Sequence, residues 1–453
     1  MRHFIAGFTA ALVGLAIASV GSAMAREPGI YFRNHTSFSG KADAILPPPP
    51  ILTSQTASSS PKQPAEEISA LLDTVVKGNS SFALDLYSRL RKQEGNLFFS
   101  PYSISTALAM TYAGAGGQTA TEMAKVLHFT LEQERLHPTF AALMAELNAS
   151  KQQGYQIAVA NRLWGQKGYA FSDRFLKTTQ NDYGGGLQEV DFASATEEAR
   201  RTINNWVAQK TEDKIQDLIA PGILSAKTTL VLTNAIYFKG AWFSPFDREK
   251  TKDQPFNVTP TQQISVPMMS KTDQYGWADF DSLQVLELPY GQGEEISEEL
   301  SMVILLPKQV DGLANMEQQL TPKNLERWLS SLKYEQMVAV WLPKFNLTSE
   351  FELSKLLANM GMPDAFSLQA DFSAMTGKKG LFISEVIHKA FVEVNEEGTE
   401  AAASTALGMT RGPNKEFRAN RPFVFLIRDN RSGSILFLGR VLNPLQSTAA
   451  VGK

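Results

Sequence analysis

The stretch HKAFVEVNEEGTEAAAST, from His388 to Thr405, changes character half-way along. The run Phe391–Val394 combines aromatic and β-branched residues, which predicts a strand. After Gly398 most residues are small, and no proline occurs before Pro413. Taken alone, an alanine-rich run of this kind also fits the start of a helix or a flexible loop. The sequence around the stretch decides between these interpretations.

Five further blocks of sequence stand before and after this stretch. They are NLFFSPYSI (Asn96–Ile104), LTNAIYFKGAW (Leu232–Trp242), ELPY (Glu287–Tyr290), NRPFVFLI (Asn420–Ile427) and FLGRV (Phe437–Val441). In this order and at this spacing, the six motifs closely resemble those of the serpin family. The resemblance spans about residues 66–444.

The hydrophobic pattern independently indicates an α+β fold. Helical patterns predominate early, at Ile68–Arg91, Ser103–Tyr112 and Thr196–Gln209. Strand-like runs predominate later, at Leu230–Leu232, Met302–Leu306, Val338–Leu342, Phe391–Val394, Phe423–Ile427 and Ile435–Leu438. Many strands with segregated helices are typical of large, mostly antiparallel sheets. The resemblance implies the serpin fold in particular: a large central, mostly antiparallel sheet and further sheets, surrounded by helices, with an exposed reactive-centre loop.

The resemblance also implies a suicide inhibitor of proteases that is not itself an enzyme. A serine protease attacks the exposed loop, and the cut loop inserts into the central sheet as a new strand before the covalent acyl complex can hydrolyse. The metastability of the uncut inhibitor drives this step, because insertion adds ladder hydrogen bonds and buries side chains. A non-inhibitory serpin, which acts as a binding or carrier protein, is the alternative function.

The residues after Gly398 suit such an insertion. Alternate side chains of a strand point to opposite faces, so one set would point inward and the other outward. The inward set is Thr399, Ala401, Ala403 and Thr405, and the outward set is Glu400, Ala402, Ser404 and Ala406. The inward side chains are small, and the single charge lies on the outer face. The 14 residues from Gly398 to Arg411 would span about 46 Å at roughly 3.3 Å per residue, enough to cross a sheet. Residues 398–405 are therefore the expected insertion hinge.

The reactive bond is expected between Arg411 and Gly412. Arg411 is the only basic residue in the central part of the loop, and a basic side chain before the cut suits a trypsin-like protease. The usual family spacing from Gly398 instead places the cut after Gly412, where Pro413 makes a poor bond for most serine proteases. Thr410 and Met409 remain alternatives, for a protease with a small or apolar pocket.

Other functional positions are implied by their motifs. Ser100, Ser103, Asn234 and His388 match the serpin shutter, a buried polar cluster beneath the strands that must separate. Buried polar groups need partners, so hydrogen bonds among these four would hold the sheet closed and re-form once it has opened. Trp242 matches the breach, at the end of the sheet where the loop enters. For His388 and Trp242, ordinary core packing is the competing interpretation.

Catalytic, metal and cofactor sites are not expected. The chain has no cysteine, which excludes disulfides, thiolate nucleophiles and cysteine-ligated metals. It contains no Gly-x-Ser-x-Gly, His-Glu-x-x-His or Walker motif. Only His128, His137 and His388 lie within the region that resembles serpins. A hydrolase is therefore a poor interpretation of this sequence.

The N-terminal residues predict an exported protein. Residues 1–25 have a short basic start, an apolar run and a small-residue site, as in a secretory signal peptide cleaved after Ala25. Residues 26–65 contain 7 prolines and 6 serines and predict a semi-extended tether. The serpin domain is expected at 66–444, followed by a C-terminal tail at 445–453. An exported chain without cysteine favours a bacterial source, with the protein secreted or periplasmic.

The charge balance limits the partners. A formal net charge of −3 gives no basic surplus for nucleic acid, and no run after the signal is long enough to span a membrane. Residues 121–150 carry only Lys125 and Arg135 as basic residues, which argues against activation by heparin-like polyanions. The expected partner of this monomer is a target serine protease, and the loop sequence leaves open whether cysteine proteases are trapped as well.

Overall fold

The computed structural model describes residues 64–149, 154–291, 299–334, 336–398 and 415–447. All of these belong to one compact unit, Pro61–Lys453. The predicted signal peptide, nearly all of the predicted tether and loop residues 399–414 lie outside the described residues.

The helices expected from the sequence are present as α1, α2 and α6. The described α-helices are α1 (Pro64–Leu90), α2 (Pro101–Tyr112), α3 (Gly117–Leu127), α4 (Gln133–Ala149), α5 (Asp173–Tyr183), α6 (Thr196–Lys210), α7 (Leu313–Gln319), α8 (Pro322–Ser330), α9 (Ser354–Met360) and α10 (Ser373–Thr376), with short 3₁₀ turns at η1 (Arg248–Lys250) and η2 (Asp364–Phe366). The start of α2 follows from its sequence, because Ser100 caps the first turn and Pro101 begins it.

The described strands form three sheets, whose members are given in spatial order. The six-stranded sheet contains β1 (Leu97–Phe99), β15 (Ile435–Val441), β14 (Phe423–Asp429), β9 (Leu300–Pro307), β8 (Leu283–Tyr290) and β7 (Gly276–Asp279). The four-stranded sheet contains β13 (Lys415–Arg418), β10 (Met337–Pro343), β6 (Gln262–Gln274) and β5 (Lys252–Thr259). The five-stranded sheet contains β11 (Phe345–Glu352), β12 (Glu385–Val394), β4 (Leu230–Gly240), β2 (Tyr155–Gln166) and β3 (Leu187–Val190).

The five-stranded sheet differs from the other large sheet in its strand directions. The six-stranded sheet is antiparallel throughout, in line with the expected fold class. In the five-stranded sheet, β11–β12 and β2–β4 are antiparallel, whereas β12–β4 and β2–β3 are parallel. β4 and β12 can run parallel because the long segment 241–384 connects them. The junction between β4 and β12 is called the seam below.

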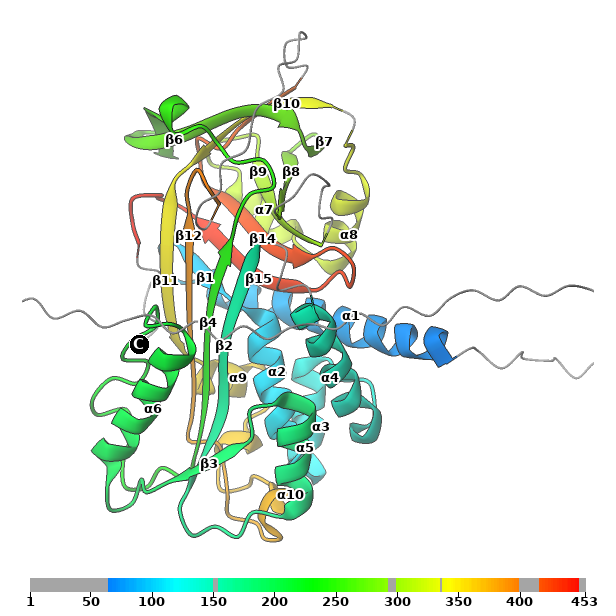
Figure 1. The fold of residues 1–453 in the computed structure, drawn as a ribbon, viewed down its shortest axis with the longest axis vertical. Helices are drawn as coiled ribbons and strands as arrows, with labels where there is room; N and C mark the ends of the chain where they lie inside the picture. The colour runs from blue at the N-terminus through cyan, green and yellow to red at the C-terminus, as the bar shows by residue number, and fades with distance from the viewer. Residues whose placement is uncertain (1–63, 150–153, 292–298, 335, 399–414, 448–453) are drawn as a thin grey trace, which may run out of the picture. The chain divides into compact units, whose positions relative to one another are not determined.

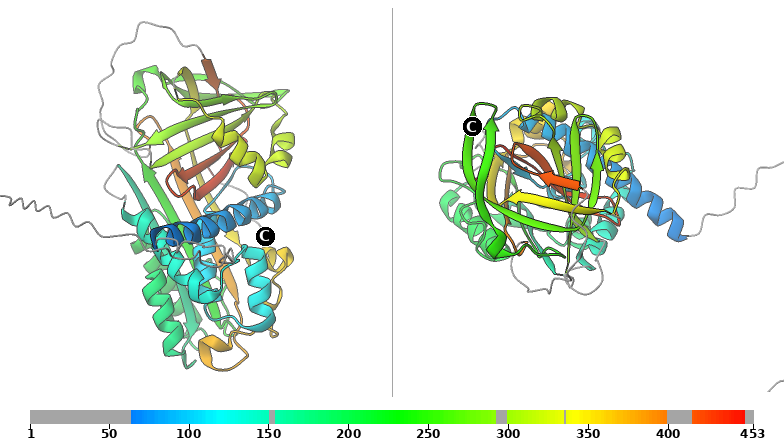
Figure 2. Two further views of the ribbon diagram at one scale, coloured as in Figure 1. Left: turned by 90° about the vertical axis from the view of Figure 1, so that its right-hand side faces the viewer. Right: turned by 90° about the horizontal axis from the view of Figure 1, so that it is seen from above.

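Strand β4 is buried on both faces of the five-stranded sheet. On one face Ile236 joins the core that contains Leu108 of α2, and on the other Ala235 packs with Ile203 of α6. α2 and α6 therefore cover opposite faces of this sheet (Figures 1 and 2). Because successive side chains of a strand alternate, Asn234 shares the α2 face with Ile236.

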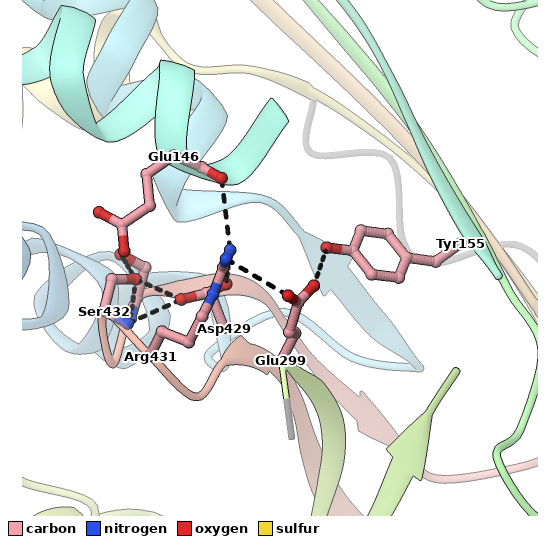
Figure 3. A network of polar contacts seen from close by, with 7 residues as sticks. Glu146, Tyr155, Glu299, Asp429, Arg431 and Ser432 are labelled. Carbon is pink, nitrogen blue, oxygen red and sulfur yellow. Dashed lines mark hydrogen bonds and ion pairs between the residues drawn. The ribbon is translucent and has the colours of Figure 1, made fainter. Parts of the chain in front are cut away.

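A polar network ties α4 and β2 to the β14–β15 hairpin (Figure 3). Arg431 pairs with Asp429 at 3.2 Å and with Glu299 at 3.4 Å, and it donates to the carbonyl oxygen of Glu146 at 3.3 Å. The hydroxyl of Tyr155 donates to Glu299 at 3.4 Å. One guanidinium thus links the end of α4 and the start of β2 to the six-stranded sheet.

Candidate functional site

A row of side chains crosses the seam. In the strand register, Phe351 of β11 faces His388 of β12, His388 faces Asn234 of β4, and Asn234 faces Asn161 of β2. His388 and Asn234 are almost fully buried, and the rings of Phe351 and His388 are stacked. Three polar side chains therefore lie next to one another inside the sheet, where they need hydrogen-bond partners.

Hydrogen bonds connect this row to α2. His388 Nδ1 bonds to Asn234 Oδ1 across the seam. Asn234 Nδ2 donates to Ser103 Oγ at 2.6 Å and also to Asn161 Oδ1. β4 and β12 cannot separate while the hydrogen bond between His388 and Asn234 is intact. We call this bond and the side chains that support it the lock, because it holds the sheet closed.

Ser100 attaches the same cluster to one further element, β15. Its backbone N–H donates to His388 Nε2 at 3.2 Å, and its hydroxyl donates to the carbonyl oxygen of Leu436 in β15 at 2.6 Å. Its Oγ also accepts the N–H of Ser103 as the cap of α2. The structure therefore brings together all four residues expected in the shutter. Their role in opening the sheet stays a prediction.

The cluster fixes the protonation state of His388. Nε2 accepts the Ser100 N–H and so carries no proton, which leaves Nδ1 as the donor to Asn234. Burial lowers the pKa of His388 to about 3, although the hydrogen bond with Asn234 acts in the opposite direction. His388 is therefore neutral near pH 7 and serves as a hydrogen-bonding link, not as a base.

Asn161 completes the cluster, and the motif comparison did not identify it. Its Oδ1 also accepts from the Ser103 hydroxyl at 3.2 Å, and its Nδ2 donates to the carbonyl oxygen of Ser103 at 3.3 Å. The only signal in the sequence is one amide within the run IAVANRLW. That signal is weak, because strand register and not residue type decides whether such an amide meets the seam.

The C-terminal end of β12 leads into a tight turn. Asn395 and Gly398 exchange backbone hydrogen bonds of 3.1 and 3.2 Å. Gly398 also forms an antiparallel bridge with Ala241, the residue that follows β4. Gly398 therefore lies between the ends of β12 and β4 and pairs with both. The remaining hinge residues, 399–405, and the expected reactive bond, Arg411–Gly412, lie outside the described residues.

Only glycine fits at position 398. Its φ of +102° lies in a region that residues with a side chain rarely adopt. A Cβ atom there would lie 2.3 Å from the carbonyl oxygen of Gly240 and 2.4 Å from the backbone nitrogen of Trp242. The close approach of the turn to the end of β4 thus depends on this glycine.

Trp242 lies at the same end of the seam, where the sequence places the breach. Its indole N–H donates to the carbonyl oxygen of Asn395 at 2.9 Å, and its backbone N–H donates to that of Glu397 at 3.0 Å. Its ring stacks on Tyr290, with 4.5 Å between the ring centroids. Trp242 therefore joins β8 to the turn that begins the loop.

Two acidic residues of the turn are held by basic side chains. Lys344 pairs with the buried Glu396 at 2.8 Å, and the Thr251 hydroxyl donates to the same carboxylate at 2.8 Å. Burial acts to raise the pKa of Glu396, but the hydrogen bonds from Lys344 and Thr251 outweigh it and lower the pKa below its usual value. Glu397 pairs with Arg248. These ion pairs anchor the start of the loop to the segments around β5 and β11.

Within the described ranges, no group of three or more His, Asp or Glu side chains is arranged to hold a metal ion. No described helix combines the length and the apolar character needed to cross a membrane. The arrangement that remains is a sheet with a polar lock at its seam and an anchored turn at one end of that seam.

A family model described as "Serpin (serine protease inhibitor)" matches residues 77–444. The chain belongs to the serpin family. Human leukocyte elastase inhibitor is 45% identical to this serpin over 386 residues, which cover 82% of this chain and all of the relative. Human Serpin B3 is 41% identical over 396 residues with the same coverage. The solved structure of human thyroxine-binding globulin in complex with its ligand has a TM-score of 0.75 at 32% identity and covers 83% of this chain and all of that one.

The comparisons confirm the serpin fold and the expected class of activity. Relatives of this serpin are named as inhibitors, so it is a protease inhibitor and not a catalyst. The relatives include human, pig and rat proteins, which give no support to the bacterial origin expected from the lack of cysteine. Cysteine content is a weak marker of source because a large core needs no disulfides. Export after Ala25 stays a prediction.

Proposed function

We propose that this serpin traps serine proteases by inserting its cut loop into the seam between β4 and β12. The observation that carries the proposal is the position of Gly398, which already pairs with Asn395 on one side and with Ala241 on the other. Both bridges are antiparallel. A strand that continued from Gly398 would run antiparallel to both neighbours.

The strand register supports this direction. Seven residues beyond Gly398 along an antiparallel ladder, Thr405 would face Asn234 on β4 and His388 on β12. Asn234 and His388 face each other across the closed seam. The two bridges therefore predict one common register, in which Thr405 would lie at the lock. Its hydroxyl can both donate and accept, so it can replace the partner that each side chain loses.

The side-chain pattern of the hinge fits the same register. Ala401 would lie between the buried Val392 and Phe238, on the packed face. Glu400 would lie beside the exposed Glu393, on the solvent face. Insertion would replace one parallel strand pair by two antiparallel ones, which adds backbone hydrogen bonds. That gain is the proposed source of the trapping energy.

The specificity is proposed from the loop sequence and from the names of the relatives. Arg411 before the cut suits a trypsin-like protease, whereas relatives named for leukocyte elastase favour a protease with a small or apolar pocket, which would cut after Thr410 or Met409. In the proposed register Met409 would face Leu230, the first residue of β4. All these cuts therefore leave enough chain to fill the seam. We take Arg411 as the first candidate.

A carrier function is the second candidate, because human thyroxine-binding globulin, with its bound ligand, has a similar structure. The inhibitor is favoured because the hinge carries alanine and serine at 401–404, whereas bulky, charged or proline residues there are typical of non-inhibitory serpins. We further propose that the protein is exported as a monomer after cleavage behind Ala25.

The deciding experiment mixes the chain from Arg26 onward with trypsin and, separately, with leukocyte elastase. An SDS-stable adduct is expected with at least one of them, and mass spectrometry of the released C-terminal peptide identifies the bond. A peptide that begins at Gly412 assigns the cut to Arg411, one that begins at Arg411 assigns it to Thr410, and one that begins at Thr410 assigns it to Met409. Clean cleavage by both proteases without any adduct would contradict the trapping mechanism and favour the carrier. The same assay with papain tests the cysteine proteases.

A further inference from the structure

Strand β11 forms one edge of the five-stranded sheet. It pairs with β12 on one side, and no described strand lies along its other side. Backbone groups alternate along a strand, so every second residue of β11 directs its N–H and C=O groups towards this free edge. An unpaired edge can bind another extended chain, and natural proteins usually protect it. The free edge of β11 is therefore a candidate docking surface.

The last described residue, Ser447, already contacts this edge. The N–H of Thr348, in the middle of β11, donates to the carbonyl oxygen of Ser447 at 2.8 Å. Because backbone groups alternate, Glu350 and Glu352 also direct their N–H groups towards the free edge. Neither of these two N–H groups has a hydrogen-bond partner among the described residues. Two donors next to the Ser447 contact are thus open for further pairing.

The side chain of Asn96 holds the chain that leads to Ser447. Its Oδ1 accepts the N–H groups of Leu442 and Asn443 at 2.7 and 3.0 Å. Its Nδ2 donates to the carbonyl oxygens of Asn443 and Gln446 at 2.8 and 2.6 Å. Asn96 is itself buried. The route of the chain towards β11 is therefore part of the packed fold.

The direction of pairing follows from the bonds of Thr348. In an antiparallel hydrogen-bonded pair, two residues exchange both of their backbone bonds. Within the described structure, the N–H of Ser447 returns no bond to the carbonyl oxygen of Thr348. In a parallel pair that oxygen would instead accept from the residue two positions further along, which is Ala449. The observed bond therefore fits a parallel strand.

The sequence after Ser447 suits this register. Val451 would lie beside Phe351, on the face of the sheet that packs against the core. Ala450 would lie beside Glu350, on the partly exposed face. Residues 448–453 contain no proline, and their only charge is Lys453, a residue type that discourages further pairing at a sheet edge.

We propose that residues 448–453 dock on the free edge of β11 as a parallel sixth strand of the five-stranded sheet. The N–H groups of Glu350 and Glu352 would donate to the carbonyl oxygens of Ala449 and Val451. This segment lies beyond residue 444, where the match to the family model ends. Its role is to cover an edge that would otherwise pair with a second copy of the chain.

Hydrogen–deuterium exchange with residue-level fragmentation tests the docking. In the full-length chain, the amides of Glu350 and Glu352 should exchange at least about tenfold more slowly than in a chain that stops at Gln446. Amides of β2 and β4 should exchange equally in both proteins, which shows that the truncated chain is folded. Equal exchange of the Glu350 amide in the two proteins would overturn the proposal.

Two proline variants test the register. In the proposed strand the N–H of Ala449 points at Thr348, whereas the N–H of Ala450 points into solvent. Ala449→Pro removes a donor of the ladder and should speed exchange of the Glu350 amide about tenfold. Ala450→Pro is the matched control and should leave that amide unchanged. Equal effects of the two variants would show that the segment does not pair in this register.

Light scattering decides between this segment and a second copy as the occupant of the edge. The full-length chain should be monomeric, whereas the chain that stops at Gln446 should associate as its concentration rises. A full-length dimer whose Glu350 amide stays slow after the truncation would overturn the proposal and assign the edge to a second copy. A truncated chain that stays monomeric would overturn the protective role, while the exchange experiment still decides the docking.

Discussion

His388 and Asn234 face each other on neighbouring parallel strands, and the hydrogen bond between their side chains crosses the seam of the five-stranded sheet. Ser100 holds the other side of the imidazole, and Ser103 holds the amide. Each partner of the lock is thus tied to α2, so the helix acts as a common base for both strands. If β4 and β12 separate, the hydrogen bonds of His388 with Ser100 and of Asn234 with Ser103 have to change as well.

The first prediction concerns pH. The pKa of His388 is about 3 in the folded protein and near 6.5 when unfolded. Between these two pH values the unfolded chain binds more protons at this histidine than the folded protein does. The contribution of the neutral His388 to the free energy of unfolding is therefore complete above about pH 6.5 and is lost as the pH falls towards 3. His388→Gln should remove that dependence. Between pH 6 and 4.5, urea unfolding should show that the wild type loses about 1.4 kcal/mol per pH unit more than the variant. Equal slopes would contradict the neutral, buried histidine.

The second prediction concerns Gly398. Gly398→Ala should destabilise the protein far more than Gly380→Ala, a matched control whose φ of +110° is similar but whose added Cβ meets nothing within 4 Å. Strain at positive φ costs about 1 kcal/mol at both sites, and only Gly398→Ala adds the clash with Gly240. Urea denaturation compares the two variants. Equal losses would mean that the turn adapts without cost.

The third prediction concerns the face of the inserted strand. Thr399→Arg would bury a charge between the strands, whereas Glu400→Arg would place one in solvent. The first variant should behave as a substrate, with several-fold more inhibitor consumed per trapped protease. The second should stay close to the wild type. If the two variants had the same stoichiometry, the proposed register would be wrong.

The fourth prediction concerns the ion pair of the turn. Lys344→Glu and Glu396→Lys each leave two like charges at the anchored start of the loop, so each should cost about 1–3 kcal/mol in urea denaturation. The double variant restores opposite charges and should recover part of that loss, though not the Thr251 bond. If the double variant loses as much free energy of unfolding as the two single variants lose together, the two residues are not coupled.

The fifth prediction concerns the network at the β14–β15 hairpin. Arg431→Met leaves the buried Asp429 without its cationic partner and should cost about 1–3 kcal/mol. Arg174→Met removes an ion pair that is exposed on both sides and should cost less than about 1 kcal/mol. Thermal or urea denaturation of the two variants at equal pH measures the difference.

Much of the fold was predictable because the decisive signals are local. The capping pattern at Ser100-Pro101 and the β-branched runs at 302–306 and 423–427 appear as a helix start and as strands β9 and β14. Those patterns depend only on neighbours along the chain. The parallel direction of β4 and β12 was not predictable in this way, because it is set by where residues 241–384 return to the sheet.

The candidate site likewise contains residues that local sequence identified and one that it did not. Long motifs around Ser100, Asn234 and His388 identified its residues by resemblance, since those residue types stand at the family's positions. Asn161 was missed because an isolated amide in a strand carries no sign of its partners. Its place in the lock depends on the register of β2 against β4.

By itself the sequence determined the α+β class, the small, proline-free hinge and the residue types of the lock, all of which follow from local pattern and side-chain chemistry. Only the tertiary structure decided that His388 and Asn234 meet across a parallel seam and that Gly398 already pairs with the residues that follow both strands. These relationships join residues that lie far apart in the chain. Pairing, burial and the pKa of His388 arise from that three-dimensional proximity, which no local pattern encodes.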